Sequence, residues 1–341
     1  MSREYWAKRS EQISIAQHKR TDAYSVIMAA EYEKALSSME RDLESWWARF
    51  AANNEIDLAE ARKLMTAGEL KEFKWTIKEF MTAAKNNGDG SWSKMLENVY
   101  IRSRMSRLDA LMIQMQHHIE MVTESERVGL ESILTTSYPD SYYQTMFAVH
   151  QGIGVGVTFA KLDTKAITEA VNRPWLKENF SSRVWSDRDK LVLEARTQIT
   201  QGIVRGDGLR DIEGALAKRM KVGKDTAERL VRTEAAHILE EAAFKAYKDS
   251  GVIDKYQILA TLDSKTSATC RGMDGKIFTL AEKETGVTYP PLHARCRTTT
   301  VAYFDDYDPE TERRSARNED GKAITVPGSM TYSEWKQKFG V

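Results

Sequence analysis

The side chains best suited to chemistry lie in one short C-terminal segment. Cys270 and Cys296 are the only two cysteines in 341 residues, and His293 stands three positions before the second of them. Thiolate and imidazole groups are ligands that zinc prefers in proteins. Pro290 and Pro291 stiffen the backbone just before the histidine. The sequence therefore predicts that the two thiols and the imidazole meet in space.

A metal ion is one way for these side chains to meet, and a structural zinc site needs a fourth ligand. We take Asp263 as the tentative fourth ligand beside Cys270, His293 and Cys296, with Asp274 or a water molecule as the other candidates. A disulfide between the cysteines is a second interpretation. In a third, both thiols are buried and neutral, and His293 hydrogen-bonds a backbone group or Asp263.

An open coordination position on zinc would also suit catalysis, because a carboxylate can then act as general base on a zinc-bound water. Glu234 and Asp274 are the candidate bases of such a zinc-dependent enzyme. His237 lies one turn after Thr233 and is more typical of a helical histidine that pairs with a carboxylate. These interpretations stay open at the level of sequence.

The framework that supports this segment is predicted to be helical, because apolar side chains recur at intervals of three and four along much of the chain. One apolar face comprises Leu36, Met39, Leu43, Trp46, Trp47 and Phe50, and another comprises Leu108, Leu111, Met112, Met115, Ile119 and Val122. Shorter helical patterns occur at 58–65 and 73–81, with a break at 86–91. Alternation predicts strands at 256–262, 276–278 and 298–303. The predicted fold class is mainly α, with an elongated N-terminal helical bundle or arm, central helices and a small C-terminal α+β module.

Proline and glycine punctuate these patterns and suggest where the segments divide. Pro139 predicts a break in the N-terminal helices, and Gly223 predicts another further on. Trp335 stands within a terminal helix of an otherwise charged and partly disordered tail. Four segments follow: 1–135, a helical N-terminal arm; 136–185, an irregular connecting region; 186–304, a C-terminal domain with a Cys/His module at 251–304; and 305–341, the charged tail.

The charge balance limits the classes of partner. The chain has 50 basic and 50 acidic side chains, so its formal net charge is zero. A protein that coats duplex DNA normally carries a basic excess, which disfavours that function, although a local basic face is left open. No apolar run is long enough for a transmembrane helix, and the first residues lack the apolar stretch of a signal peptide. We therefore expect a protein of a reducing cytoplasm, without a membrane span.

Several short motifs occur in a fixed order between Trp175 and Tyr303. They comprise Pro174-Trp175, Arg183-Val-Trp185, Arg232-Thr233-Glu234, Asp274-Gly275, and Pro290-Pro291-Leu-His293-Ala-Arg-Cys296-Arg297. In this combination the segment resembles the tailed-phage head morphogenesis family, the minor capsid proteins related to the F protein of phage Mu. The best resemblance is to versions from phages and prophages of Gram-positive bacteria. Many relatives have additional cysteines where this chain has Met273 and Thr298, so a four-cysteine metal site is excluded here.

The resemblance implies a structural role in assembly, without enzymatic turnover. It implies association with the portal protein and with capsid or scaffold proteins, a place in the interior of the phage head, and a part in procapsid assembly or DNA delivery. It places the chain in the host cytoplasm during assembly. Some relatives carry a fused C-terminal toxin domain, which the short tail leads us not to expect here. The alternatives are the zinc-dependent enzyme and a module that binds packaged DNA.

Overall fold

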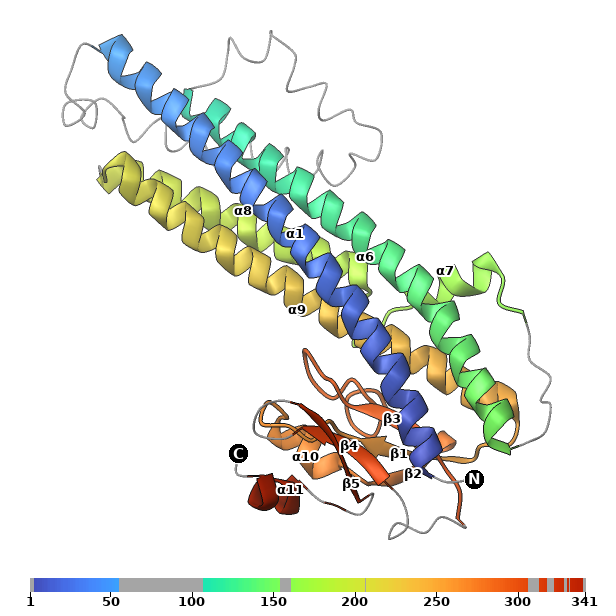
Figure 1. Cartoon of the computed structure of the whole chain (residues 1–341). Coiled ribbons are helices and arrows are strands. Elements are labelled where there is room, and N and C mark those ends of the chain that lie inside the picture. Colours follow the sequence, from blue (N-terminus) through green and yellow to red (C-terminus); the bar gives the residue numbers. More distant parts are fainter. Residues whose placement is uncertain are drawn as a thin grey trace. The chain divides into compact units, whose positions relative to one another are not determined.

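The computed structural model describes residues 3–54, 107–153, 161–205, 207–305, 313–317, 322–327, 330 and 332–339 (Figure 1). The helical patterns expected at 58–65 and 73–81, and the break at 86–91, lie outside these residues. The predicted mainly α class with a small C-terminal sheet is confirmed. Four long helices account for most of it: α1 (Arg3–Asn54), α6 (Arg107–Ile153), α8 (Phe180–Arg205) and α9 (Leu209–Ser250). Among the described helices, none is long and apolar enough to cross a membrane.

The chain forms two compact units, each built from segments that are distant in sequence. Unit 1 comprises Met1–Ser25, Val128–Ser181 and Glu228–Val341, and unit 2 comprises Val26–Arg127 and Ser182–Ala227. The sequence predicts consecutive segments that divide near residues 135 and 185. The structure does not follow these divisions, because one part of each of α1, α6 and α9 belongs to unit 1 and the other part to unit 2.

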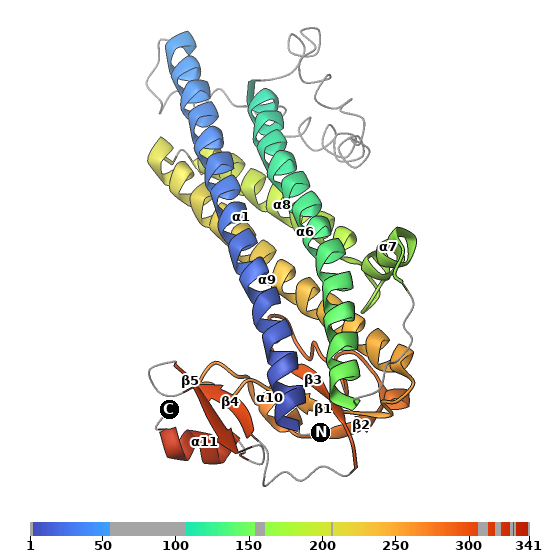
Figure 2. The ribbon, with the colours of Figure 1, turned by 45° about the vertical axis from the view of Figure 1, so that its right-hand side comes forward.

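Unit 2 contains a segment of each long helix, and these four segments run side by side (Figures 1 and 2). Met39 and Leu43 on α1 and Leu111 on α6 are fully buried, and Trp46 is 8% exposed, as their helical spacing predicts. A buried ion pair also joins α8 to α6, with Arg188 Nη1 2.7 Å from Glu120 Oε1. The apolar stripes of the sequence are therefore the core of this unit.

Unit 1 contains the C-terminal module. Its sheet has the order β2-β1-β3, in which β1 (Lys255–Leu259) pairs antiparallel with both β2 (Ile277–Thr279) and β3 (Thr299–Tyr303). The strands lie where alternation predicts them. Tyr256 and Ile258 of β1 are fully buried and share a core with Ala243 and Tyr247, from the last turns of α9. The sheet therefore packs against the C-terminal part of α9.

The break predicted at Pro139 is wrong, because α6 continues through this residue to Ile153. A proline inside a helix removes one hydrogen bond and costs about 3 kcal/mol or more. Tyr138 is 5% exposed, Tyr142 is fully buried, and Ser141 Oγ donates a hydrogen bond to the Leu239 carbonyl of α9 at 3.1 Å. Burial of this helix face offsets the local penalty. Much of the region expected to be irregular is accordingly helical, including α7 (Thr164–Asn172).

The break predicted at Gly223 is also wrong, because α9 passes through it without interruption. A Cβ atom at this position would lie 2.8 Å from Leu191 Cδ2 on α8 and 3.2 Å from Tyr32 Cε1 on α1. Real Cβ contacts are not this short, so the absent side chain lets neighbouring helices of unit 2 approach closely. The glycine is a packing position inside a helix.

The C-terminal tail carries regular structure. Its strands β4 (Arg313–Arg317) and β5 (Ala323–Pro327) form an antiparallel pair, and the terminal helix α11 (Tyr332–Phe339) is present where Trp335 suggests it. Trp335 is fully buried and packs in a small core with Leu262, Ala316 and Val326. The expectation of a partly disordered tail is therefore wrong for these strands and this helix, since a few apolar residues suffice to pack them on the module.

Candidate functional site

The Cys/His cluster is assembled from a short helix and a loop. Cys270 lies on α10 (Ala268–Met273), whose N-cap is Ser267: the serine Oγ accepts a hydrogen bond from the Cys270 amide at 3.2 Å. His293 and Cys296 lie on the loop that follows the cis peptide bond between Pro290 and Pro291. The Cys296 amide donates to the His293 carbonyl at 3.2 Å, which closes a turn between the two side chains.

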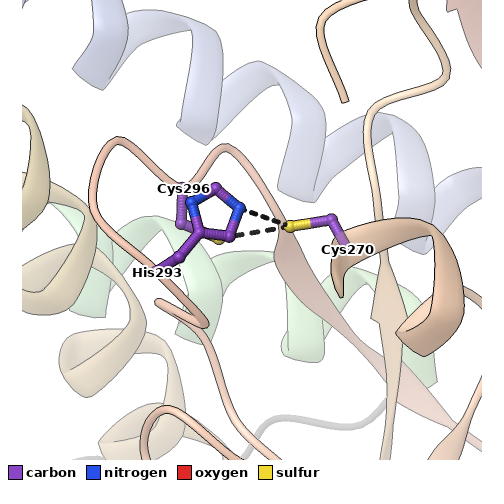
Figure 3. Close-up of side chains that lie close together, drawn as sticks. All are labelled: Cys270, His293 and Cys296. Atoms are coloured by element: carbon purple, nitrogen blue, oxygen red, sulfur yellow. Dashed lines mark hydrogen bonds between the residues drawn. The ribbon is translucent and has the colours of Figure 1, made fainter. Parts of the chain in front are cut away.

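The predicted meeting of the three side chains takes place in this structure. Cys270 Sγ, His293 Nε2 and Cys296 Sγ all lie within 4.8 Å of one another. Cys270 Sγ is 3.0 Å from His293 Nε2 and 3.7 Å from Cys296 Sγ (Figure 3). Both thiols are buried, with Cys270 3% and Cys296 2% exposed, and both are free in this structure.

The polar surroundings make the two thiols unequal. The hydrogen-bonded contact with Cys296 lowers the pKa of Cys270 well below the usual range of a thiol, and the neighbouring polar groups of Ser267, Thr298 and His293 act in the same direction. The same bond to Cys270, together with burial, raises the pKa of Cys296. Cys270 is therefore the more acidic thiol of the pair.

Asp263 is not part of this cluster, which corrects its tentative role as fourth ligand. Its carboxylate forms an ion pair with Arg297, whose Nη2 donates to Asp263 Oδ1 at 2.7 Å, and it also accepts from the Thr266 hydroxyl at 3.1 Å. Burial alone would raise the pKa of Asp263, but the bonds from Arg297 and Thr266 hold it below its ordinary value. The motif residue Arg297 is therefore the partner of the carboxylate that its position in the sequence suggests as a metal ligand.

Asp274 and Gly275 shape the chain beside the cluster. Asp274 Oδ1 accepts a hydrogen bond from the Ala260 amide at 2.9 Å, and the residue is the C-cap of α10. Gly275 has φ of +79°, a conformation that glycine adopts without steric cost, and its amide donates to the Ile258 carbonyl at 2.9 Å. The pair therefore turns the chain from α10 into β2, and the Asp274 carboxylate is engaged in that turn.

The motif Arg232-Thr233-Glu234 on α9 connects three separate segments of unit 1. Arg232 Nη1 is 2.7 Å from Asp22 Oδ1 on α1. Thr233 Oγ1 accepts a hydrogen bond from the amide of Arg295, in the loop that carries His293 and Cys296, at 3.1 Å. These contacts join α1 and the cluster loop to the same turn of α9.

The third residue of this motif meets the Pro174-Trp175 motif. Trp175 Nε1 donates a hydrogen bond to Glu234 Oε2 at 2.9 Å, and its ring stacks on His237 with centroids 4.1 Å apart. Glu234 is 2% exposed. The carboxylate considered as a general base is therefore bonded to the tryptophan, and His237, expected to pair with a carboxylate, stacks on an indole. Neither Glu234 nor Asp274 belongs to the Cys/His group.

Arg183 and Trp185 belong to unit 2, on α8, and the ring of Trp185 lies 4.9 Å from the Arg188 guanidinium carbon. Two polar residues of unit 1 were not predicted from the sequence: Ser267, which lies at the Cys/His cluster, and Glu240, whose side chain lies between α9 and β3. Ser267 Oγ lies 2.8 Å from His293 Nε2, and the preference for serine at an N-cap three positions before Cys270 is a signal that would have found it. Glu240, bonded to two threonines of β3, has no local signal in the sequence.

Comparison with known proteins indicates a related family. Residues 194–301 match the family described as Phage Mu protein F like protein, which confirms the resemblance drawn from the motifs. The matched segment contains the α9 motif and both parts of the Cys/His cluster.

Among individual proteins, the chain is 23% identical over 300 residues to the minor head protein GP7 of Bacillus phage SPP1, which covers 84% of this chain and 94% of that protein. It is 24% identical over 209 residues to the NAD(+)–arginine ADP-ribosyltransferase EFV of Enterococcus faecalis, which covers 57% of this chain and 41% of that enzyme. No solved structure gives a significant match.

Proposed function

We propose that this chain is a minor head protein of a tailed phage or prophage and acts in head morphogenesis. The observation that carries this proposal is its similarity to the SPP1 minor head protein, which extends over 84% of this chain and 94% of the relative. The Mu protein F like segment at 194–301 supports the same class. Similarity that spans nearly the whole of a relative supports a shared role better than similarity confined to one module.

The proposed role is structural. The motif residues of unit 1 are engaged in joining elements: Thr233 holds the cluster loop, Glu234 holds Trp175, and Arg297 holds Asp263. The similarity to the ADP-ribosyltransferase covers 41% of that enzyme, so the activity in its name is not carried over to this chain. The role that we propose therefore requires no turnover.

The partners that fit this role are the portal protein and the capsid or scaffold proteins of the same phage. We place the protein in the host cytoplasm during assembly and in the interior of the head afterwards, where it acts in procapsid assembly or in DNA delivery. Contact with packaged DNA is a narrower possibility within this proposal, and the zero net charge of the chain argues against a dominant electrostatic contribution.

Co-assembly with the portal tests the proposal. The full chain would be expressed with the portal, scaffold and major capsid proteins of its own phage, and procapsids would be purified and probed for it. An unrelated helical protein of similar mass at the same expression level controls for passive enclosure. We expect the chain to be retained in procapsids, to be enriched over the control, and to co-purify with the portal when capsid protein is omitted. A chain no more abundant in procapsids than the control would refute the assembly role.

Two further measurements separate the finer parts of the proposal. Deleting the gene from the phage and counting full heads against DNA-injecting virions distinguishes a role in assembly from one in delivery. Retention on DNA at low and moderate salt tests genome contact, since electrostatic binding must weaken steeply as salt rises. No retention at low salt would remove DNA from the list of partners and leave the assembly role untouched.

A further inference from the structure

The Cys270, His293 and Cys296 side chains converge in a group that the argument for the assembly role does not use. We propose that these three residues bind one zinc-type divalent cation, with an oxygen from Ser267 or a water molecule in the fourth position. The donor set, two sulfurs and one imidazole nitrogen, suits a borderline-soft ion and is a poor match for magnesium or calcium, which take oxygen ligands. Among the described residues, this is the one group of three such side chains whose ligand atoms converge.

The separations of the ligand atoms fit a tetrahedral ion. With Zn–S bonds of about 2.3 Å, two sulfurs of a tetrahedral site lie roughly 3.8 Å apart. Cys270 Sγ and Cys296 Sγ are 3.7 Å apart in this structure. The expected sulfur-to-nitrogen separation is about 3.5 Å, against 3.0 Å between Cys270 Sγ and His293 Nε2. The third pair, Cys296 Sγ and His293 Nε2, lies within 4.8 Å. Small side-chain rotations would therefore bring the three ligand atoms to the separations that the ion requires.

The imidazole of His293 is oriented as a metal ligand requires. Its Nδ1 lies 2.7 Å from the carbonyl oxygen of Ala294, and a carbonyl only accepts, so Nδ1 carries a proton and donates it. The other ring nitrogen, Nε2, faces Cys270 Sγ and Ser267 Oγ. Metal-binding histidines characteristically donate their second ring N–H to a backbone carbonyl or carboxylate in this way, which sets both tautomer and ring direction.

The backbone around the ligands is held independently of any ion. Ser267 caps the helix that carries Cys270, and Thr233 of α9 accepts from the amide of Arg295 in the loop that carries the other two ligands. Arg295 has φ of +58°, in the left-handed region that non-glycine residues seldom adopt, and the hydrogen bond from its amide helps to hold this turn. Asp263 is committed to Arg297, which leaves the remaining coordination position to a neutral oxygen. Two thiolates would balance the charge of a divalent ion without a carboxylate.

Binding is a ligand exchange without oxidation. Any proton still held on the two sulfurs leaves to solvent. The two sulfurs and the unprotonated Nε2 then each donate an electron pair to the ion, which loses bound water. The ion would join α10 to the loop after Pro291, and through Thr233 that loop is bonded to α9. We therefore assign it a structural role, and its removal should loosen the C-terminal module.

Metal analysis of the full chain, purified without a chelating tag under reducing conditions, tests the proposal. We expect about one zinc per chain and, on replacement with Co²⁺, the visible absorption of a tetrahedral site with a thiolate-to-cobalt charge-transfer band. Cys270→Ser, Cys296→Ser and His293→Gln should each weaken zinc binding more than about 100-fold, beyond what loss of an outer hydrogen-bond partner causes. The matched variant Asp263→Asn should keep the metal, because that carboxylate lies outside the site.

A measurement on the unmodified chain guards against variants that fail to fold. Zinc should protect both thiols from a thiol reagent, and a chelator should restore their reactivity. The proposal is overturned if zinc and cobalt titrations give no binding and no thiol protection, if the three ligand variants bind as tightly as the wild type, or if Asp263→Asn abolishes binding while remaining folded. A disulfide between Cys270 and Cys296 that persists in reductant would also overturn it. None of these results bears on co-assembly with the portal.

Discussion

Replacing Glu240 by glutamine should change how the stability of this protein depends on pH. Glu240 lies on α9 and is 1% exposed. Its Oε1 accepts a hydrogen bond from the Thr299 hydroxyl at 2.6 Å, and its Oε2 accepts one from the Thr300 hydroxyl at 3.0 Å. Burial raises the pKa of Glu240 to about 7, although the bonds from the threonines oppose the shift. The folded protein therefore holds a proton on this carboxyl over a range in which the unfolded chain loses it.

The magnitude follows from the two pKa values. The ordinary value is 4.5 and the folded value is about 7, and each pKa unit corresponds to about 1.36 kcal/mol. Below pH 4.5 both states are protonated, and the group has no differential effect. As pH rises from there to about 7, the folded state binds more protons than the unfolded state, so the free energy of unfolding falls by about 3 kcal/mol in total. Above that range the loss is complete and constant.

Urea unfolding of wild type and Glu240→Gln at a series of pH values measures this effect. Glutamine resembles the protonated carboxyl in shape, so the two proteins should differ least near pH 4.5, and the wild type should lose about 3 kcal/mol relative to the variant by about pH 8. Burial also raises the pKa of Glu126, to about 8. Because both proteins contain Glu126, subtracting one curve from the other isolates Glu240. The exposed Glu284→Gln serves as a control and should leave the difference flat.

The test depends on how the difference between the two free energies of unfolding changes with pH, since a difference that is constant with pH reports only on packing of the glutamine amide. Parallel curves for wild type and Glu240→Gln from about pH 4.5 to about pH 8 would show that Glu240 titrates alike in both states. A wild type that gained stability with rising pH relative to the variant would reverse the sign of the argument. Either result would refute the reasoning from burial.

Three more substitutions test packing and hydrogen bonding by thermal or urea unfolding. Gly129→Ala should lower the free energy of unfolding by about 1–3 kcal/mol, because the new Cβ would lie 2.4 Å from the ring of Tyr24. Gly214→Ala, whose new Cβ would meet nothing within 4 Å, should raise it by up to about 1 kcal/mol. Equal effects of the two substitutions would contradict the packing argument. Trp175→Phe keeps an aromatic ring but removes the indole N–H that donates to buried Glu234, and it should cost about 1.5–3 kcal/mol. The loss should shrink markedly in a Glu234→Met background, which has no acceptor oxygen, if this hydrogen bond is its cause.

Much of the site followed from residue types and spacing. Two cysteines in a long chain, gathered near one histidine, have few reasons to be close in sequence other than a shared contact, and their side chains do converge. Helical periodicity likewise identified the buried faces of α1 and α6, because a residue's side of a helix is set by its position in the repeat. Strand alternation located the sheet for the same reason. These are local properties, and local sequence determines them.

Partners between distant segments were decided by the tertiary structure. Its position in the sequence suggested Asp263 as a metal ligand, but folding brings Arg297 against this buried carboxylate, which is engaged in an ion pair and hydrogen bonds. Thr233 and Glu234 could be recognised as a motif, yet their contacts with Arg295 and Trp175 join residues about sixty positions apart. No periodicity within one helix encodes such a pairing.

The sequence by itself determined the mainly α class, the location of the three strands β1, β2 and β3, and the composition of the Cys/His cluster. The tertiary structure decided that α6 passes through Pro139 and that α9 passes through Gly223. The physical reason is one of magnitude. A proline or glycine disfavours a helix by about 1–3 kcal/mol, whereas burying several large side chains on that helix stabilises it by about 1.5–3 kcal/mol each. Local signals set the preference of a segment, and the sum of its distant contacts sets the outcome.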